Sequence, residues 1–102
     1  MKRVELSSRD IEHFGSHGFA HTRVARGDSF QVSLADLDGA IGGHDAASRQ
    51  VLVVVSGRVV CSTREESVEL GVGEAVEWQE GEWHETRSLE KSRVLLVEGV
   101  FE

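Results

Sequence analysis

The sequence predicts an all-β fold, a sandwich or a barrel, from three observations. Apolar residues gather in runs of strand length, glycine-containing turns separate these runs, and the chain has no proline, so Gly, Asp and Ser have to make every turn. The runs recur at intervals of about ten residues, which is typical of β-sandwiches and β-barrels.

The strand expected around residue 30 shows the clearest alternation. Phe30, Val32 and Leu34 alternate with Gln31 and Ser33, which is the period of a half-buried strand. We expect the Phe30 set to face the interior, because a small barrel has to be filled. Turns are expected at residues 38–39 and 42–43, and further strands over residues 51–55, 58–63, 68–70, 75–78, 84–88 and 94–97.

The run Val51–Val55 is apolar on both faces of its strand. Strands of this kind are buried on both sides. One face is therefore expected in the interior and the other against a second sheet or a second subunit. We expect a homodimer that buries the outer face.

The N-terminal segment is expected to be a short helix or an irregular stretch. Ser7 or Ser8 is a suitable N-cap, whereas Gly15 and Gly18 interrupt any regular pattern. On a continuous helix, three histidines spaced four residues apart would form a metal-binding stripe. Because the glycines disfavour such a helix, surface or loop positions are the preferred interpretation for His13, His17 and His21.

Length and charge limit the classes of function. A chain of 102 residues is expected to form one domain, residues 1–102. A formal charge of −7 disfavours nucleic acid and anionic lipid as partners, because both are negatively charged. No run reaches the ~18 apolar residues that cross a bilayer, and the polar start lacks the apolar core of a signal peptide. We therefore expect a cytoplasmic protein without membrane contact, and we expect the single cysteine, Cys61, to be a core residue rather than a nucleophile.

The segment Gly73–His84 has a distinctive spacing. Gly73 and Gly81 frame a short strand and a bend, and His84 begins the next strand. This spacing resembles the second sequence motif of the cupin family. The family usually has proline at the bend, where this chain has Gln79, and asparagine four residues after the histidine, where it has Ser88.

The region before Gly57 resembles the first cupin motif less completely. Gln50 stands seven residues before Gly57, where the family has glutamate. The first of the family's two histidines falls on His44 and the second on Ala46. The resemblance covers about residues 39–99.

This resemblance implies a double-stranded β-helix, or jelly-roll, barrel and a metal site inside it. Complete sites of the family hold Fe, Mn, Ni or Zn with three histidines and one carboxylate, which offsets the charge of the cation. Here His44, Gln50 and His84 remain as a degenerate metal site, and the neutral Gln50 replaces the anion. A bound divalent transition metal and a metal-free pocket both stay open.

Strand alternation extends the expected pocket. If Gln50 and His84 point inward, every second residue after each of them does too, and Val51, Val53 and Val55 point outward. Trp78 and Trp83 either stack on a planar or sugar ligand or belong to the core. With Phe30, the expected ligand-binding residues are His44, Gln50, Leu52, Val54, Trp78, Trp83, Thr86 and Ser88. Three arginines either clamp a carboxylate or form rim ion pairs, namely Arg23, Arg49 and Arg87.

Two functions from different classes follow. In the first, an enzyme, a metal or His84 as general acid or base acts on a small organic acid, a sugar derivative or a phenolic compound, by dioxygenase, isomerase or lyase chemistry. In the second, a non-catalytic module binds or senses a small molecule in the barrel without metal. Loss of the second histidine and of the glutamate favours the second function, whereas the apolar lining expected beside His44 and His84 keeps the first open.

Overall fold

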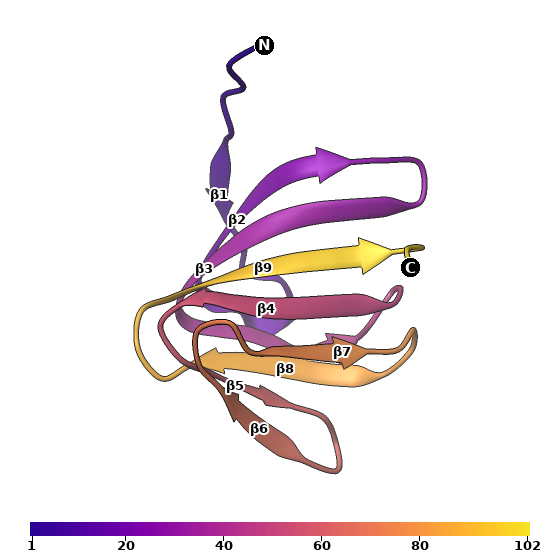
Figure 1. Cartoon of the computed structure of the whole chain (residues 1–102). Helices are drawn as coiled ribbons and strands as arrows, with labels where there is room; N and C mark the ends of the chain where they lie inside the picture. Colours follow the sequence, from indigo (N-terminus) through magenta and orange to yellow (C-terminus); the bar gives the residue numbers. More distant parts are fainter.

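The computed structural model describes residues 1–102, in which nine antiparallel strands form a nearly closed barrel (Figure 1). The predicted all-β fold is therefore confirmed. No helix in it has the length and apolar character needed to cross a bilayer. The strands are β1 (Ser8–Asp10), β2 (His17–Arg26), β3 (Phe30–Asp45), β4 (Gln50–Ser56), β5 (Val59–Ser62), β6 (Ser67–Leu70), β7 (Ala75–Trp78), β8 (Trp83–Ser88) and β9 (Ser92–Gly99).

The long strand β3 joins the two sides of the barrel. Its first half pairs with β9 from Phe30 to Leu37, and its second half pairs with β8 from Ala40 to Asp45. The strand order is β6-β5-β8-β3-β9-β4-β7, and β2 pairs with β3 and with the short β1 (Figure 1). The register brings His44 directly opposite His84.

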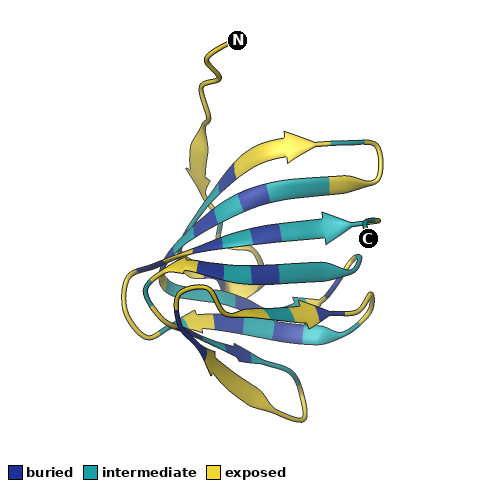
Figure 2. Cartoon of the chain, viewed as in Figure 1, coloured by how far each residue is buried: buried dark blue, intermediate teal, exposed yellow.

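The interior changes from apolar to polar along the strands. Inward-facing residues form cross-strand rows, because directly paired residues share a face of the sheet. At the apolar end, Ala35, Val94 and Val54 are at most 1% exposed. The next row is Ser33, Leu96, Leu52 and Val76, and the row at the other end is Gln31, Glu98, Gln50 and Trp78. Figure 2 shows buried positions recurring along β3, β9 and β4.

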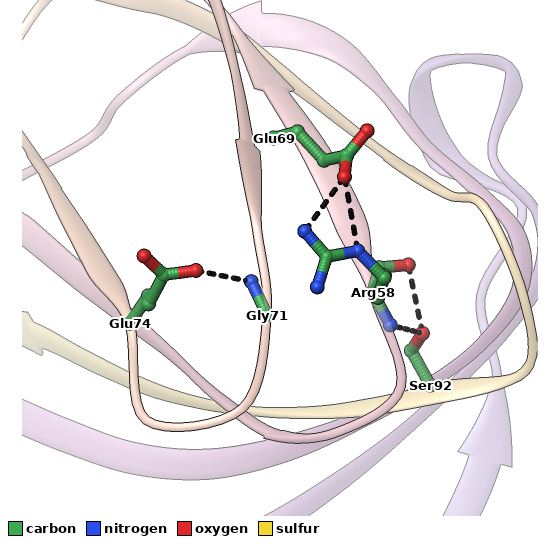
Figure 3. Close-up of polar contacts among 5 residues, drawn as sticks. All are labelled: Arg58, Glu69, Gly71, Glu74 and Ser92. Atoms are coloured by element: carbon green, nitrogen blue, oxygen red, sulfur yellow. Dashed lines mark hydrogen bonds and ion pairs between the residues drawn. The ribbon is translucent and has the colours of Figure 1, made fainter.

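Polar contacts hold the turns at the apolar end. Arg58 donates to Glu69 from Nε at 2.9 Å and from Nη2 at 2.6 Å. The hydroxyl of Ser92 lies 3.0 Å from both the backbone N–H and the carbonyl of Arg58. The backbone N–H of Gly71 donates to Glu74 at 2.7 Å (Figure 3). The barrel is therefore tied together at this end, and the opposite end carries the pocket.

The face that β3 turns inward differs from the sequence prediction. Ser33 and Ala35 are fully buried, whereas Phe30 is 41% exposed, so the expectation that the Phe30 set faces the interior is wrong. We expected Phe30 inside because a small barrel has to be filled. Larger residues from β4, β7 and β9 fill it instead, among them Leu52, Trp78 and Leu96, which are all buried.

The turns predicted at residues 38–39 and 42–43 are also absent, because both pairs lie inside β3. Glycine at these positions allows a close approach of other groups rather than a reversal of the chain. A Cβ on Gly42 would lie 1.8 Å from the carbonyl oxygen of Phe14, and one on Gly43 would lie 2.0 Å from the Trp83 ring. The sequence does not distinguish these uses of glycine.

The N-terminal segment is mainly extended, so the helical alternative predicted for it is wrong. Residues 8–10 form β1, and the only helical element is a three-residue 3-10 turn, His13–Gly15. The pairing of β1 with β2 satisfies backbone groups that a helix would have satisfied internally. The three histidines consequently do not share one helix face.

Cys61 is a core residue, as expected. Its side chain is 3% exposed, and it lies opposite Thr86 on β8. Burial raises the pKa of the thiol to about 11, against a smaller opposing effect of the Thr86 hydroxyl. The thiol is therefore protonated at neutral pH and is a poor nucleophile.

Candidate functional site

Four aromatic rings form a column through the polar end of the barrel. The ring centroids of His44 and His84 are 4.5 Å apart. Trp78 stacks on His84 at 4.3 Å, and Phe14 stacks on His44 at 4.4 Å with an interplanar angle of 9°. The cross-strand pairing of His44 with His84 explains why the two imidazoles meet.

Backbone hydrogen bonds select the tautomer of both histidines. Nδ1 of His44 lies 2.8 Å from the Gly42 carbonyl, and Nδ1 of His84 lies 3.1 Å from the Glu82 carbonyl. Since a carbonyl only accepts, each Nδ1 carries a proton and donates, which leaves Nε2 as a free acceptor in the neutral ring. Neither Nε2 atom has a hydrogen-bond partner, and neither is fully buried, because Ser33 Oγ is the only fully buried side-chain polar atom without a partner. Both histidines line the cavity, so their Nε2 atoms are accessible from it.

Burial lowers the pKa of His84 below its ordinary value, and the hydrogen bond to the Glu82 carbonyl opposes this effect only in part. The neighbouring His44 lowers the pKa of His84 further. His21, on β2, also has a lowered pKa because of burial, and the negative charge of Glu98 opposes this change. His84 is therefore neutral at pH 7 and acts as an acceptor.

A short N-terminal segment covers the column. This cover segment, residues 11–16, is closed by the hydrogen bond from Ile11 N–H to the Phe19 carbonyl at 2.9 Å. It is fixed on β3 by a buried hydrogen bond of 2.9 Å from the Gly42 N–H to Ser16 Oγ. Phe14 has φ 58° and ψ 27°, a left-handed conformation that is costly for a residue with a side chain. The residue is 64% exposed and its ring stacks on His44, so the strain accompanies a contact at the site.

A carboxylate held by two amides closes the polar row. Glu98 accepts from Gln31 Nε2 at 3.1 Å and from Gln50 Nε2 at 3.0 Å, one bond to each carboxylate oxygen. The three residues lie side by side on β3, β9 and β4. A charge-assisted pair of hydrogen bonds fixes the orientation of Glu98 and of both amides.

These residues surround a cavity of about 280 Å³. Its wall combines apolar surface with the imidazoles and the carboxylate. The lining residues are Arg9, Ile11, His13, Phe14, Ser16, Phe19, His21, Ile41, His44, Gln50, Leu52, His84, Thr86, Leu96 and Glu98. This size and composition are suited to a ligand of about one ring with a few polar groups.

The structure places some of the expected site residues around this cavity and others elsewhere. His44, Gln50, Leu52, His84 and Thr86 line it. Val54 lies deeper in the core, and Trp78 reaches the site only by stacking on His84. The remaining three lie outside the cavity wall: Trp83 packs under the guanidinium of Arg64 at 4.7 Å, Ser88 bonds the backbone of Gly39, and Phe30 is exposed.

The arginines expected at the rim behave differently from one another. Arg49 pairs with Glu77 at 2.8 Å and lies over the Phe101 ring at 4.1 Å. Arg87 is exposed on the outer side of β8, and Arg23 lies beside the mouth of the cavity without an ion pair.

The donor set does not complete a metal site. No group of three or more His, Cys, Asp and Glu side chains is arranged to hold a metal ion. At the positions of the family's ligands the chain has His44, His84 and the Gln50 amide, whose nitrogen donates to Glu98. This set contains no anion, so the residues do not fit the complete ligand set that the family resemblance implies.

Sequence reasoning missed most of the cavity wall, including Phe14, Glu98 and Arg9. It also missed Gln31, which donates to Glu98. Glu98 continues the alternation of the inward-facing Val94 and Leu96, so the period of the last strand contained the necessary signal. Gln31 lies on the same face of β3 as Ser33, which is the face that the sequence prediction had placed outside. No local pattern indicates that Phe14 stacks on His44, because that contact joins segments about thirty residues apart.

Comparisons at the sequence level give no match, either to a protein-family model or to a curated protein. Solved structures match closely in fold. The polyketide cyclase RemF from Streptomyces resistomycificus aligns over 100% of this chain and 87% of its own, with 20% identity and a TM-score of 0.82. A RmlC-like cupin from Shewanella frigidimarina NCIMB 400 aligns over 93% of this chain and 84% of its own, with 14% identity and a TM-score of 0.83. KdgF from Halomonas sp. aligns over 94% and 88%, with 22% identity and a TM-score of 0.78. The nearly closed antiparallel barrel and these alignments together show that the chain has the cupin, jelly-roll fold.

Proposed function

We propose that this protein binds a small organic molecule in the barrel, through the Nε2 atoms of His44 and His84, without requiring a metal. The observation that carries the proposal is the pair of imidazoles whose Nδ1 atoms are both bonded to backbone carbonyls. Both Nε2 atoms are left as acceptors at the wall of a cavity of about 280 Å³.

The chemistry of the wall defines the ligand. The imidazole Nε2 atoms, the Glu98 carboxylate and the Gln50 carbonyl all accept hydrogen bonds. Leu52, Ile41 and Leu96 supply apolar surface beside them. A molecule with a small apolar or aromatic body and hydroxyl or N–H donors satisfies both features, as phenols and sugar derivatives do.

A metal-dependent enzyme is the second candidate, and one observation favours it. Hydrogen bonds from Nδ1 to a carbonyl are the usual means of orienting histidines that bind metal through Nε2. A protein of the same fold is a polyketide cyclase. In this alternative His44, Gln50 and His84 would hold Fe, Mn, Ni or Zn, and His84 would be catalytic.

Metal analysis of protein purified without a histidine tag separates the two candidates. We expect less than one tenth of an equivalent of Fe, Mn, Ni or Zn after supplementation with each metal. We also expect a thermal shift with phenols or sugars in chelator-treated protein. The His84→Gln variant should lose the shift, and the His17→Gln variant, which removes an exposed histidine outside the cavity, should keep it. Stoichiometric metal lost in His84→Gln would contradict the metal-free function and support the enzyme.

We further propose a homodimer through the outer face of the sheet. Six half-buried apolar residues form two adjacent cross-strand rows there, which supports the expectation based on the outer valines. The rows are Val32–Val97–Val51 and Leu34–Leu95–Val53. Light scattering at micromolar concentration should give twice the chain mass, and a monomeric mass would refute the dimer.

A further inference from the structure

A second cavity of about 380 Å³ opens beside the first, at the mouth of the barrel. We call it the polar annex. No hydrophobic residue lines it, and it shares Arg9 and His21 with the first cavity, so the two lie next to each other. The residues that line the polar annex are Ser7, Ser8, Arg9, His21, Arg23 and Gln31.

The sheet register places three basic side chains of the annex, Arg9, His21 and Arg23, on one face. Arg9 on β1 lies directly opposite His21 on β2. Arg23 follows His21 by two residues and pairs with Ser33, which is a buried inward-facing residue of β3. Residues two apart on a strand share a face, so Arg9, His21 and Arg23 extend the concave face of the barrel beyond its mouth.

Both arginines of the annex lack an anionic partner. The ion pairs of the protein are Arg49–Glu77, Arg58–Glu69 and Arg93–Asp36, and none of them includes Arg9 or Arg23. Both arginines are close enough to His21 to lower its pKa through their positive charge. In a chain of formal charge −7, two free guanidiniums beside two serine hydroxyls form a local site for an anion.

Glu98 forms no ion pair with Arg9 or Arg23. Its oxygens accept from the neutral amides of Gln31 and Gln50, which orient the carboxylate and leave its negative charge in place. Its negative charge lies in the wall of the first cavity and repels an anion from the barrel. The two cavities therefore select opposite ends of one ligand: hydrogen-bond donors in the barrel and negative charge in the annex.

We propose that the polar annex binds an oxyanion, a carboxylate or a phosphate, carried by the same molecule whose body lies in the barrel. This inference rests on the proposed binding of a small molecule at His44 and His84, and it narrows the ligand to an organic acid or a phosphate ester. Arg9 and Arg23 contact the oxyanion, with Ser7 and Ser8 as additional donors.

Calorimetric titration with three matched probes tests the annex. The probes are para-hydroxybenzyl alcohol, para-hydroxybenzoate and para-hydroxyphenyl phosphate, which share the phenol and differ in the opposite end. We expect at least one anionic probe to bind about tenfold more tightly than the alcohol, as two charge-assisted contacts allow. The anion that gains more affinity distinguishes a carboxylate from a phosphate.

Two variants locate the effect. The double variant Arg9→Gln/Arg23→Gln should bind all three probes with the affinity of the alcohol. Arg87→Gln removes one positive charge from the outer side of β8 and should keep the preference for the anion. Equal binding of the anions and the alcohol to the unmodified protein, or a preference that survives in the double variant, would overturn the inference.

Inorganic phosphate separates this inference from the proposed function. We expect millimolar phosphate to shift the Arg9 and Arg23 side-chain resonances in NMR spectra. Phosphate binding without binding of any phenol would support the annex and contradict the function proposed for the barrel. Binding of the alcohol alone would support the barrel function and overturn the annex, and no binding of any probe would overturn both.

Discussion

The substitution Gly42→Ala should release the cover segment from the barrel. A Cβ at this position would lie 1.8 Å from the Phe14 carbonyl oxygen and 2.7 Å from the carbonyl carbon. Both are backbone atoms of the turn, so no side-chain rotation relieves the clash. The segment has to move away from β3.

The cost follows from the contacts that are lost. Displacement breaks the buried hydrogen bond between the Gly42 N–H and Ser16 Oγ, which contributes about 0.5–1.5 kcal/mol. It also separates Phe14 from His44, a stacked pair that contributes about 0.5–1.5 kcal/mol. The free energy of unfolding should therefore fall by about 1–3 kcal/mol, and Tm by about 5 °C or more.

Urea denaturation measures the stability, and peptide mapping after diethyl pyrocarbonate treatment measures the exposure of His44. We expect the reactivity of His44 to rise in Gly42→Ala. Gly27→Ala is the matched control, because its Cβ would meet only the side chain of Phe30, which is exposed and free to rotate. A Gly42→Ala protein with stability within about 0.5 kcal/mol of the unmodified chain and unchanged His44 reactivity would refute the reasoning.

Three further predictions concern single side chains. The lowered pKa of His84 means that the unfolded chain takes up a proton before the folded protein does. Stability should therefore be independent of this group above about pH 6.5 and fall below it by at most about 1.4 kcal/mol per pH unit. In metal-free protein, urea denaturation of His84→Gln at several pH values should show a shallower fall, and an unchanged slope would contradict the assignment. Ser33 Oγ is fully buried without a partner, so Ser33→Ala should leave stability unchanged or raise it by about 1 kcal/mol, and a clear loss of stability would reveal an unrecognised hydrogen bond. Because Phe14 is left-handed, Phe14→Gly should be more stable than Phe14→Ala by about 1 kcal/mol in the same denaturation assay, and the reverse order would contradict the strained turn.

The strand pattern and the position of the pocket histidines were predictable from the sequence. The strand 75–78 was expected and β7 spans Ala75–Trp78, because glycine turns define both ends of it. The resemblance to the two cupin motifs, aligned on Gly57, Gly73 and Gly81, placed His44 and His84 in one pocket, and both line the cavity. These features depend on local sequence, in which turn residues and periodicity are informative.

The rest depends on contacts between distant segments. Gly42 resembles a turn residue in the sequence, but it serves the approach of the Phe14 backbone to β3. Glu98 is a charged residue near the end of a strand, where exposure is the usual expectation. Only the pairing of β9 with β3 and β4 brings Gln31 and Gln50 to its two oxygens and makes an inward position favourable.

The most direct test of the account follows the imidazole nitrogens of His44 and His84 by NMR during titration with small phenols, sugars and organic acids. In the free protein we predict a proton on Nδ1 and none on Nε2 for both residues. A ligand should shift the Nε2 resonances of both histidines without protonating the rings. Protons on Nε2 in the free protein, or ligands that bind while leaving both Nε2 resonances unchanged, would contradict the account.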